Sequence, residues 1–295
     1  MSAELENYIP LNHTPHARAE KDLYSDAHRE MLLPMDSVKL MNFPKFNAMT
    51  GGFRPFEFSI LCGATGTGKT TLCANISRDL IEQKVPHFVA SVETGPLDFM
   101  KRIISAMNRT DWNTGDAISV ESAKRFHENH GHHFQSNTLQ LSLYDNRIKI
   151  ETLLADIAWM VKHKNIKIAI IDNLNFFLEV TTAANAVIEM DRVIHELIIF
   201  CKRIPVHIIM VMHPRKGEER IESENDIKGS STANQEAHNI FLFNRPHPDL
   251  IKAGTADPGD REILLAKMRR RGKYVRRRLL LKPICEVAYL EGAIV

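Results

Sequence analysis

An eight-residue stretch in the first quarter of the chain has the residue types of a phosphate-binding loop. It reads Gly63, Ala64, Thr65, Gly66, Thr67, Gly68, Lys69 and Thr70. This is the spacing of a Walker A loop, in which glycines let consecutive backbone N–H groups turn inward around phosphates. In such a loop Lys69 reaches the β- and γ-phosphate oxygens, and the Thr70 hydroxyl ligates Mg²⁺. We therefore expect a site for ATP and Mg²⁺, with Thr71 as the last residue of the cofactor-binding set.

The segments on both sides of this loop favour a phosphate site over a chance match in a glycine-rich turn. The apolar run at residues 56–62 is typical of a buried strand. Residues 71–83 carry apolar side chains at helical spacing, which predicts a helix. The phosphates would then lie at a helix N-terminus, where backbone N–H groups and the helix dipole favour anions.

Two acidic residues follow predicted strands, at the place where ligands bind in open α/β sheets. Glu93 comes after the strand at 87–92 and is our candidate general base for the attacking water. The alternative is that Glu93 only favours the dipole of the helix at 97–107. Asp172 ends the β-branched run at 166–171 and matches a Walker B acid, which belongs to the Mg²⁺ shell.

A polar, basic segment follows the next predicted strand, at residues 206–212. His213 is the first residue after it and is placed to sense a γ-phosphate. Arg215 and Lys216 come next, so the state of the nucleotide can pass to a basic loop. The alternative is an ordinary exposed loop. Strands at 239–244 and 262–268 follow, and the second starts a hairpin through the basic run 269–278, a pattern typical of a solvated face or a nucleic-acid patch.

Length and composition limit the class of protein. The chain has 295 residues, 44% of them hydrophobic, which is enough for one sizeable core. The order of strands and helices predicts an α/β fold with a mainly parallel central sheet flanked by helices and a C-terminal β-hairpin. We assign residues 1–42 to a tail or short linker helix and 43–295 to one domain. The net charge is only +2, so any affinity for nucleic acid has to come from local basic patches.

The cysteine pattern and the hydropathy indicate a compartment. The four cysteines are widely spaced, which favours reduced, packed thiols over a disulfide framework. No apolar run approaches the ~20 residues that span a bilayer, and the N-terminus lacks a signal-peptide pattern. We expect a soluble protein with no membrane partner, in the cytoplasm of a bacterial or phage-infected cell or, alternatively, in an organellar matrix.

Together these landmarks resemble the RecA-like P-loop motor domain of DnaB-family replicative helicases, of the phage primase-helicase and Twinkle type. The resemblance covers roughly residues 43–290. Its most specific parts are Gly68-Lys69-Thr70-Thr71, Ser91-Val92-Glu93, His213-Pro214-Arg215-Lys216, and Ile227-Lys228-Gly229-Ser230-Ser231 leading to Gln235-Glu236-Ala237.

The resemblance implies a role for each matching residue. Glu93 is similar to the family's catalytic glutamate, Asp172 to its Walker B acid and His213 to its sensor. Lys267 and Arg269 resemble the Lys-x-Arg pair that one subunit inserts into its neighbour's ATP site, with Arg269 as the arginine finger. The residues expected to contact single-stranded DNA in a central channel are Arg215, Lys216, Lys228, Ser230, Ser231 and Gln235.

The chain also departs from the family pattern. No primase or zinc-binding segment precedes the motor, so we do not expect a bifunctional primase-helicase. The N-terminal appendage is shorter than the usual hexamerisation domain, so a ring would depend on the linker and on the motor's own interfaces. His238 stands where relatives often have an acidic residue.

Our leading hypothesis is a ring-forming, ATP-dependent DNA helicase motor that moves along single-stranded DNA. We expect a homo-oligomer, with a hexamer as the preferred form, and a separate primase, polymerase or loader as candidate partners. One alternative is a recombinase-like DNA-dependent ATPase, because fold alone does not choose among such proteins. Another is a DNA-binding partner that uses the nucleotide only as a switch.

Overall fold

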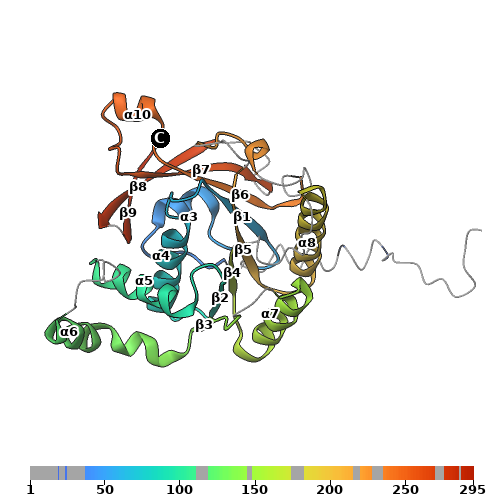
Figure 1. Ribbon diagram of the computed structural model, residues 1–295, viewed down its shortest axis with the longest axis horizontal. Coiled ribbons are helices and arrows are strands. Elements are labelled where there is room, and N and C mark those ends of the chain that lie inside the picture. The colour runs from blue at the N-terminus through green and yellow to red at the C-terminus, as the bar shows by residue number, and fades with distance from the viewer. Residues whose placement is uncertain are drawn as a thin grey trace, which may run out of the picture. The chain divides into compact units, whose positions relative to one another are not determined.

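A single mixed sheet organises the part of the chain that the structure describes. The computed structural model describes residues 19, 24, 37–110, 119–144, 148–173, 183–214, 220–227, 235–269, 276–285 and 287–295. Residues 37–295 form one compact unit around a nine-stranded sheet with the order β3-β2-β4-β5-β1-β6-β7-β8-β9 (Figure 1). The strands are β1 Phe58–Cys62, β2 His87–Ser91, β3 Leu139–Leu141, β4 Ile168–Asp172, β5 His207–Met212, β6 Asn239–Asn244, β7 Arg261–Met268, β8 Arg277–Cys285 and β9 Ala288–Ile294.

The sheet has a parallel part and an antiparallel part. From β3 to β6 every neighbouring pair is parallel. From β6 to β9 every pair is antiparallel. The expectation of a mainly parallel α/β sheet with a C-terminal hairpin is therefore confirmed, and the hairpin extends into a further edge strand, β9, which the sequence did not predict.

Helices cover both faces of the parallel part (Figure 1). They are α3 Pro44–Thr50, α4 Lys69–Glu82, α5 Pro96–Asn108, α6 Val120–His130, α7 Ile150–Lys164, α8 Ala183–Arg203 and α10 Pro248–Lys252, with short 3-10 turns η1 Gly131–Ser136 and η3 Glu224–Asp226. The cluster of buried side chains on one face includes α7 and α8, and the cluster on the other face includes α3, α4 and α5. No helix among the described residues combines the length and the apolar character needed to cross a membrane.

Burial on both faces explains why the central strands read as continuous apolar runs. All five residues of β1 are buried. Phe58, Ile60 and Cys62 join the cluster under α7 and α8, whereas Leu61 joins the one under α4 and α5. Because successive side chains of a strand point to opposite faces, a strand with helices on both sides needs apolar residues at every position.

Most elements expected from the sequence are confirmed, and the differences lie at their ends. Helix α4 begins at Lys69, so the last two residues of the Walker loop already form its first turn. The predicted strand at 139–144 is shorter, ending at Leu141. The loop expected at 176–186 is wrong at its C-terminal end, because α8 begins at Ala183, where two alanines favour a helix. Residues 174–182 lie outside the described residues, as does most of the predicted linker segment at 1–36.

Helix α3 precedes the sheet and was not predicted. Pro44 stands at its first position, where a missing N–H costs nothing. Gly51 ends the helix with a left-handed φ of 79°. Gly52 also has a positive φ of 83°, and a Cβ there would lie 2.6 Å from the Val38 carbonyl oxygen. The turn expected at this glycine pair is therefore confirmed.

Candidate nucleotide site

The Walker loop joins the end of β1 to the start of α4, and two of its glycines have no room for a side chain. A Cβ on Gly63 would lie 2.6 Å from the Phe243 carbonyl oxygen. Gly68 has a φ of 95°, and a Cβ there would lie 2.6 Å from the Tyr289 hydroxyl oxygen. A left-handed φ combined with this crowding admits only glycine. Strands β6 and β9 therefore fix the shape of the loop from the side away from the phosphate site.

Hydrogen bonds within the loop and to its neighbours hold it in place. Both the backbone N–H and the hydroxyl of Thr67 donate to the Ala64 carbonyl, at 3.3 Å and 2.8 Å. The Gly63 N–H donates to the Met212 carbonyl at 3.4 Å. From β7, Arg261 Nε donates to the Thr67 carbonyl at 2.9 Å. The loop, which continues directly from β1, is thus preorganised by its own hydrogen bonds and by contacts from β5 and β7.

Lys69 is folded back over the loop with its ammonium group close to carbonyl oxygens. Its Nζ donates to the carbonyls of Gly63 and Ala64 at 2.8 Å and 2.9 Å, and the residue is only 7% exposed. Burial lowers the pKa of Lys69, and the nearby Asp172 carboxyl acts in the opposite sense. A buried lysine in contact with neutral acceptors alone is poorly compensated, so an anionic ligand at this position would be strongly favoured.

Thr70 and Asp172 form the pair expected to hold Mg²⁺. The Thr70 hydroxyl donates to Asp172 Oδ2 at 2.7 Å, and Asp172 is 1% exposed. Burial raises the pKa of Asp172, the Thr70 hydrogen bond lowers it, and the Glu93 carboxylate raises it again. A hydroxyl oxygen and a carboxylate oxygen are hard ligands that suit Mg²⁺. No group of three or more His, Cys, Asp or Glu side chains suited to a metal occurs among the described residues, which fits a metal that takes its other ligands from phosphate and water.

Three polar residues meet beside this pair. Asn173 Nδ2 donates to Glu93 Oε2 and lies 3.3 Å from His213 Nε2. On its other ring nitrogen, His213 Nδ1 lies 3.5 Å from Lys69 Nζ. Asn173 therefore links the expected base to the expected sensor. The sequence analysis gave Asn173 no role, although its place directly after Asp172 was the available signal.

The parallel register explains why these residues converge. Ser91 pairs with Asp172, and the Val92 N–H donates to the Asp172 carbonyl at 3.0 Å. Strands β2, β4, β5 and β1 are neighbours, and all run in the same direction. Residues that directly follow these strands must therefore meet at one edge of the sheet. We call this edge, at the carboxyl ends of β1, β2, β4 and β5, the nucleotide edge.

Lys267 and Arg269 lie at the opposite edge. Lys267 pairs with Ile240 at the start of β6, and the Arg269 N–H donates to the His238 carbonyl at 2.9 Å. Because β6 and β1 are parallel, this end of β7 lies at the amino ends of the central strands. The structure does not bring these two cations to the Walker loop of their own chain.

A single carbonyl joins these two cations. Gln235 accepts a hydrogen bond from Lys267 Nζ at 2.9 Å and another from Arg269 Nη2 at 2.5 Å, both through its backbone oxygen. Burial lowers the pKa of Lys267, and the Arg269 charge lowers it further. Of the residues expected to contact DNA, Gln235 is described, and it lies beside this pair.

The other residues expected to contact DNA are Arg215, Lys216, Lys228, Ser230 and Ser231, and all lie outside the described residues. Their flanks are described. An isolated antiparallel bridge pairs Pro214 with Ile227, so the two basic segments start side by side. His238, the departure from the family pattern, accepts a hydrogen bond from the Phe58 N–H at 3.1 Å through Nδ1 and so joins β1 to the start of β6.

Comparison with known proteins agrees with this arrangement. A family model for the DnaB-like helicase C-terminal domain matches residues 40–283. A probable replicative DNA helicase from Trieres chinensis is 24% identical over 223 residues, which cover 69% of this chain and 46% of that protein. The chain therefore spans less than half of that relative's length.

Two solved structures have the same fold. One is a DnaB-like replicative helicase, described with its interactions with primase, at a TM-score of 0.73 and 15% identity over 92% of this chain and 68% of that one. The other is the ATPase domain of another helicase, at a TM-score of 0.70 and 16% identity over 90% of this chain and 95% of that one. Since the family model covers most of the sequence, this chain belongs to the DnaB-like helicase C-terminal domain family.

Proposed function

We propose that this chain is the motor of a ring-forming DNA helicase, which hydrolyses ATP between subunits and moves along single-stranded DNA. The observation that carries the proposal is the position of the charged groups. Phosphate-binding and acidic residues occupy the nucleotide edge, whereas Lys267 and Arg269 occupy the other edge of the same sheet. Groups so placed can serve one reaction only if a second copy of the chain supplies half of the site.

The residues of the nucleotide edge have separate roles in this proposal. Residues 63–71 bind the phosphates, and Lys69 neutralises charge on the transferred group. Thr70 and Asp172 would hold Mg²⁺, which when bound offsets the charge of the β- and γ-phosphates. Glu93 orients the attacking water and accepts its proton, while Asn173 fixes the direction of the Glu93 carboxylate.

The residues of the opposite edge act on a neighbour. Arg269 is the arginine finger that stabilises charge developing on the γ-phosphate, and Lys267 adds a second cation. His213 senses the γ-phosphate from within its own chain, because it lies between Lys69 and Asn173. The proposed assembly is a homo-hexamer.

The proposed DNA contacts are Arg215, Lys216, Lys228, Ser230, Ser231 and Gln235. The bridge between Pro214 and Ile227 supports a common surface for these segments. If Arg215 and Lys216 contact phosphates, replacing either with alanine should weaken single-strand binding and reduce its salt slope by about 1. An unchanged slope would remove these residues from the proposed contact set.

We further propose that a separate primase, polymerase or loader works with this motor in a cytoplasmic compartment. One structurally similar helicase was described with a primase, which motivates the first of these partners. The free thiols of Cys62, Cys73 and Cys201 are all buried, which suits a reducing compartment.

Mixing two inactive variants tests the shared site. Lys69→Ala removes the phosphate contact but leaves a normal Arg269, and Arg269→Ala does the reverse. Each variant alone should hydrolyse ATP at less than about 10⁻³ of the wild-type rate with single-stranded DNA. Mixed rings should recover turnover, because some interfaces combine an intact Walker loop with an intact finger. If mixing restores nothing while the two variants still co-assemble by native mass measurement, the finger does not act between subunits.

The same preparations separate a motor from the other classes of protein. ATP turnover stimulated by single-stranded DNA, a closed oligomer and separation of a forked duplex are expected together. Strand exchange without unwinding would instead indicate a recombinase. DNA-independent turnover by a monomer would indicate a switch.

A further inference from the structure

A buried carboxylate lies next to the Walker loop without belonging to the nucleotide site. Glu262, in β7, has no exposed surface, and its Oε1 lies 2.6 Å from Arg220 Nη2 and 3.7 Å from Arg278 Nε. Its Oε2 accepts the backbone N–H of His247 at 3.3 Å. The three partners come from separate parts of the chain: the segment after β5, the start of β8 and the residues after β6. We call Glu262, Arg220, Arg278 and Glu222 the ionic junction.

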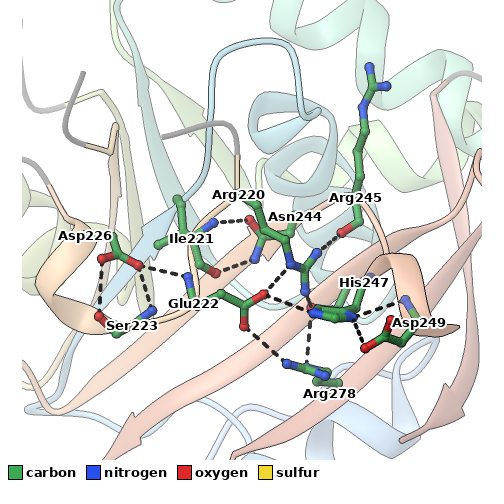
Figure 2. Close-up of polar contacts among 11 residues, drawn as sticks. Arg220, Ile221, Glu222, Ser223, Asp226, Asn244, Arg245, His247, Asp249 and Arg278 are labelled. Atoms are coloured by element: carbon green, nitrogen blue, oxygen red, sulfur yellow. Dashed lines mark hydrogen bonds and ion pairs between the residues drawn. The ribbon is translucent and has the colours of Figure 1, made fainter. Parts of the chain in front are cut away.

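The junction fastens segment 220–227 to the end of β6 (Figure 2). Glu222 accepts hydrogen bonds from the guanidinium groups of Arg220 and of Arg278, the latter at 3.2 Å. Beside it, the Asn244 side chain makes two hydrogen bonds with the backbone of Ile221, receiving its N–H at 3.0 Å and donating to its carbonyl at 2.8 Å. Segment 220–227 is thus joined to β6, β7 and β8 together.

Such a junction has a cost that packing alone does not explain. A buried charge pair is often no more stabilising than apolar residues of similar volume. Removing one partner is costly, however, because the remaining charge stays buried. Glu262 with Arg220 therefore specifies one relative position of two segments, and this is a reason to look for what those segments do.

Strand β7 connects the junction to the Walker loop. Arg261 precedes Glu262 and donates to the Thr67 carbonyl at 2.9 Å. Neighbouring residues of a strand point to opposite faces of the sheet. One pair of adjacent residues at the start of β7 therefore contacts the phosphate-binding loop on one face and segment 220–227 on the other.

The other end of β7 carries the trans-acting cations. The strand has eight residues and so spans about 24 Å between its first and last Cα atoms. At its far end Lys267 and Arg269 hold the carbonyl of Gln235, the last residue of the expected DNA-contacting segment. Ile227, which begins that segment, is bridged to Pro214. Both ends of β7 thus contact parts of the chain that flank the proposed DNA loops.

We propose that Glu262 is a positioning residue that couples the nucleotide site to the DNA-contacting segments. By holding Arg220 and Arg278, it keeps segment 220–227 and β8 in register with β7, so a displacement of the Walker loop by phosphate reaches the DNA loops through Arg261 and β7. The inference deepens the proposed helicase function and rests on it. It concerns the dependence of turnover on DNA and not the chemistry of hydrolysis.

The test compares Arg220→Gln with Arg220→Lys in the full chain. Arg220 is 22% exposed at its side chain, so its replacement is tolerated better than that of the buried Glu262. Loss of the cation should reduce the ratio of ATP turnover with and without poly(dT) by about 5-fold or more, the lower end of common coupling energies. The lysine variant keeps the charge and should recover part of that ratio. Glu262→Gln should reproduce the effect of Arg220→Gln, with the two together no worse than either alone.

Arg192→Gln is the matched control. Arg192 on α8 also pairs with several carboxylates, those of Glu151, Glu189 and Glu196, but it touches neither the Walker loop nor segment 220–227. Its loss should leave the DNA stimulation unchanged, with melting temperatures recorded for every variant.

The outcomes distinguish the two proposals. If the wild type is stimulated by poly(dT) and Arg220→Gln is stimulated equally, the coupling role of the junction is overturned while the helicase proposal stands. A lowered melting temperature with a normal stimulation ratio overturns it as well, because a purely structural role predicts that result. A wild type that does not respond to DNA would remove the proposed function and this inference with it.

Discussion

The two edges of the sheet place a lysine in opposite surroundings. At the nucleotide edge, Lys69 lies among loop carbonyls with Asp172 and Glu93 nearby. At the other edge, Lys267 shares the single Gln235 carbonyl with Arg269. Burial lowers the pKa of both lysines, but carboxylates counteract it for Lys69, whereas Arg269 adds to it for Lys267 and only Glu224 opposes it.

The difference shows which edge is complete by itself. The nucleotide edge contains cation, acid and hydroxyl groups in mutual contact. At the second edge, two cations converge on one neutral oxygen, an arrangement that favours an anion from outside the chain. A phosphate bound to a neighbouring subunit would supply it.

Removal of each lysine should break this comparison most strongly. With Lys69→Ala, ATP binding and turnover should both fall, turnover by about 10³-fold, since a preorganised charged donor to the phosphates is lost. Lys267→Ala should lower turnover by about 10²-fold and leave binding of a fluorescent ATP analogue unchanged. Equal losses of binding in the two variants would contradict the separation of roles.

Glu93→Gln should sharpen the contrast within the nucleotide edge. The amide keeps a hydrogen-bonding oxygen near Asn173 but cannot accept a proton, so kcat should fall by about 10²–10⁴-fold. The affinity for ATP should remain that of the wild type, measured by equilibrium binding. Turnover close to normal would leave Glu93 with only the alternative role, that of a carboxylate before α5.

Acid should act on the amino-terminal side of the sheet. His207 lies at the start of β5 between the Arg54 carbonyl and the Ser59 hydroxyl, each at 2.8 Å, and burial lowers its pKa to about 4. His87, at the start of β2, is likewise held at about 4 by burial, which lowers its pKa. An unfolded histidine binds a proton below about 6.5, so the stability these neutral rings provide is present above that pH and is lost as the pH falls toward 4.

We therefore expect the free energy of unfolding to decrease by a few kcal/mol between pH 6.5 and pH 4, measured by denaturant titration. His207→Gln should flatten this dependence, because the amide does not titrate. His163, an exposed histidine on α7, offers a matched control whose replacement should leave the slope as it is. A slope that is identical in His207→Gln and the wild type would assign the acid sensitivity to other groups.

The sequence predicted the nucleotide edge well because its residues follow strands in a fixed pattern. Buried parallel strands give apolar runs on both faces, and a polar residue after such a run has only one place to be. Glu93, Asp172 and His213 converge for that reason alone. The Walker spacing adds a loop whose glycines are required by contacts with Phe243 and Tyr289.

Other features could not be predicted because they depend on contacts between distant segments. Glu262 looks like any polar residue at the start of a strand, and only the fold brings Arg220 and Arg278 to it. Asn173 reaches Glu93 through a side-chain direction that strand periodicity does not specify. Strand β9 contains exposed positions and a glycine, and it is held in place by long-range contacts such as the Asn75 hydrogen bond to the Tyr289 N–H.

The smallest effect we predict is a gain of stability from Asp172→Asn. Burial raises the pKa of Asp172, so its carboxylate opposes folding once the pH exceeds the ordinary value of about 3.8. The amide can still accept the Thr70 hydrogen bond but carries no charge. The variant should therefore be more stable by on the order of 1 kcal/mol at neutral pH, which raises the melting temperature by about 2–4 °C for a domain of this size.

The sign of this effect should change with ligand and disappear with acid. Mg²⁺-ATP should stabilise the wild type more than Asp172→Asn, because the variant lacks a metal ligand. Below the folded-state pKa of Asp172 both side chains are neutral, so the difference in melting temperature should vanish there and grow as the pH rises through that value. Calorimetry at several pH values, with and without Mg²⁺-ATP, measures both trends. A variant that is less stable than the wild type at neutral pH without ligand would mean that the carboxylate stabilises the loop by itself, and the nucleotide edge would then be complete without a metal.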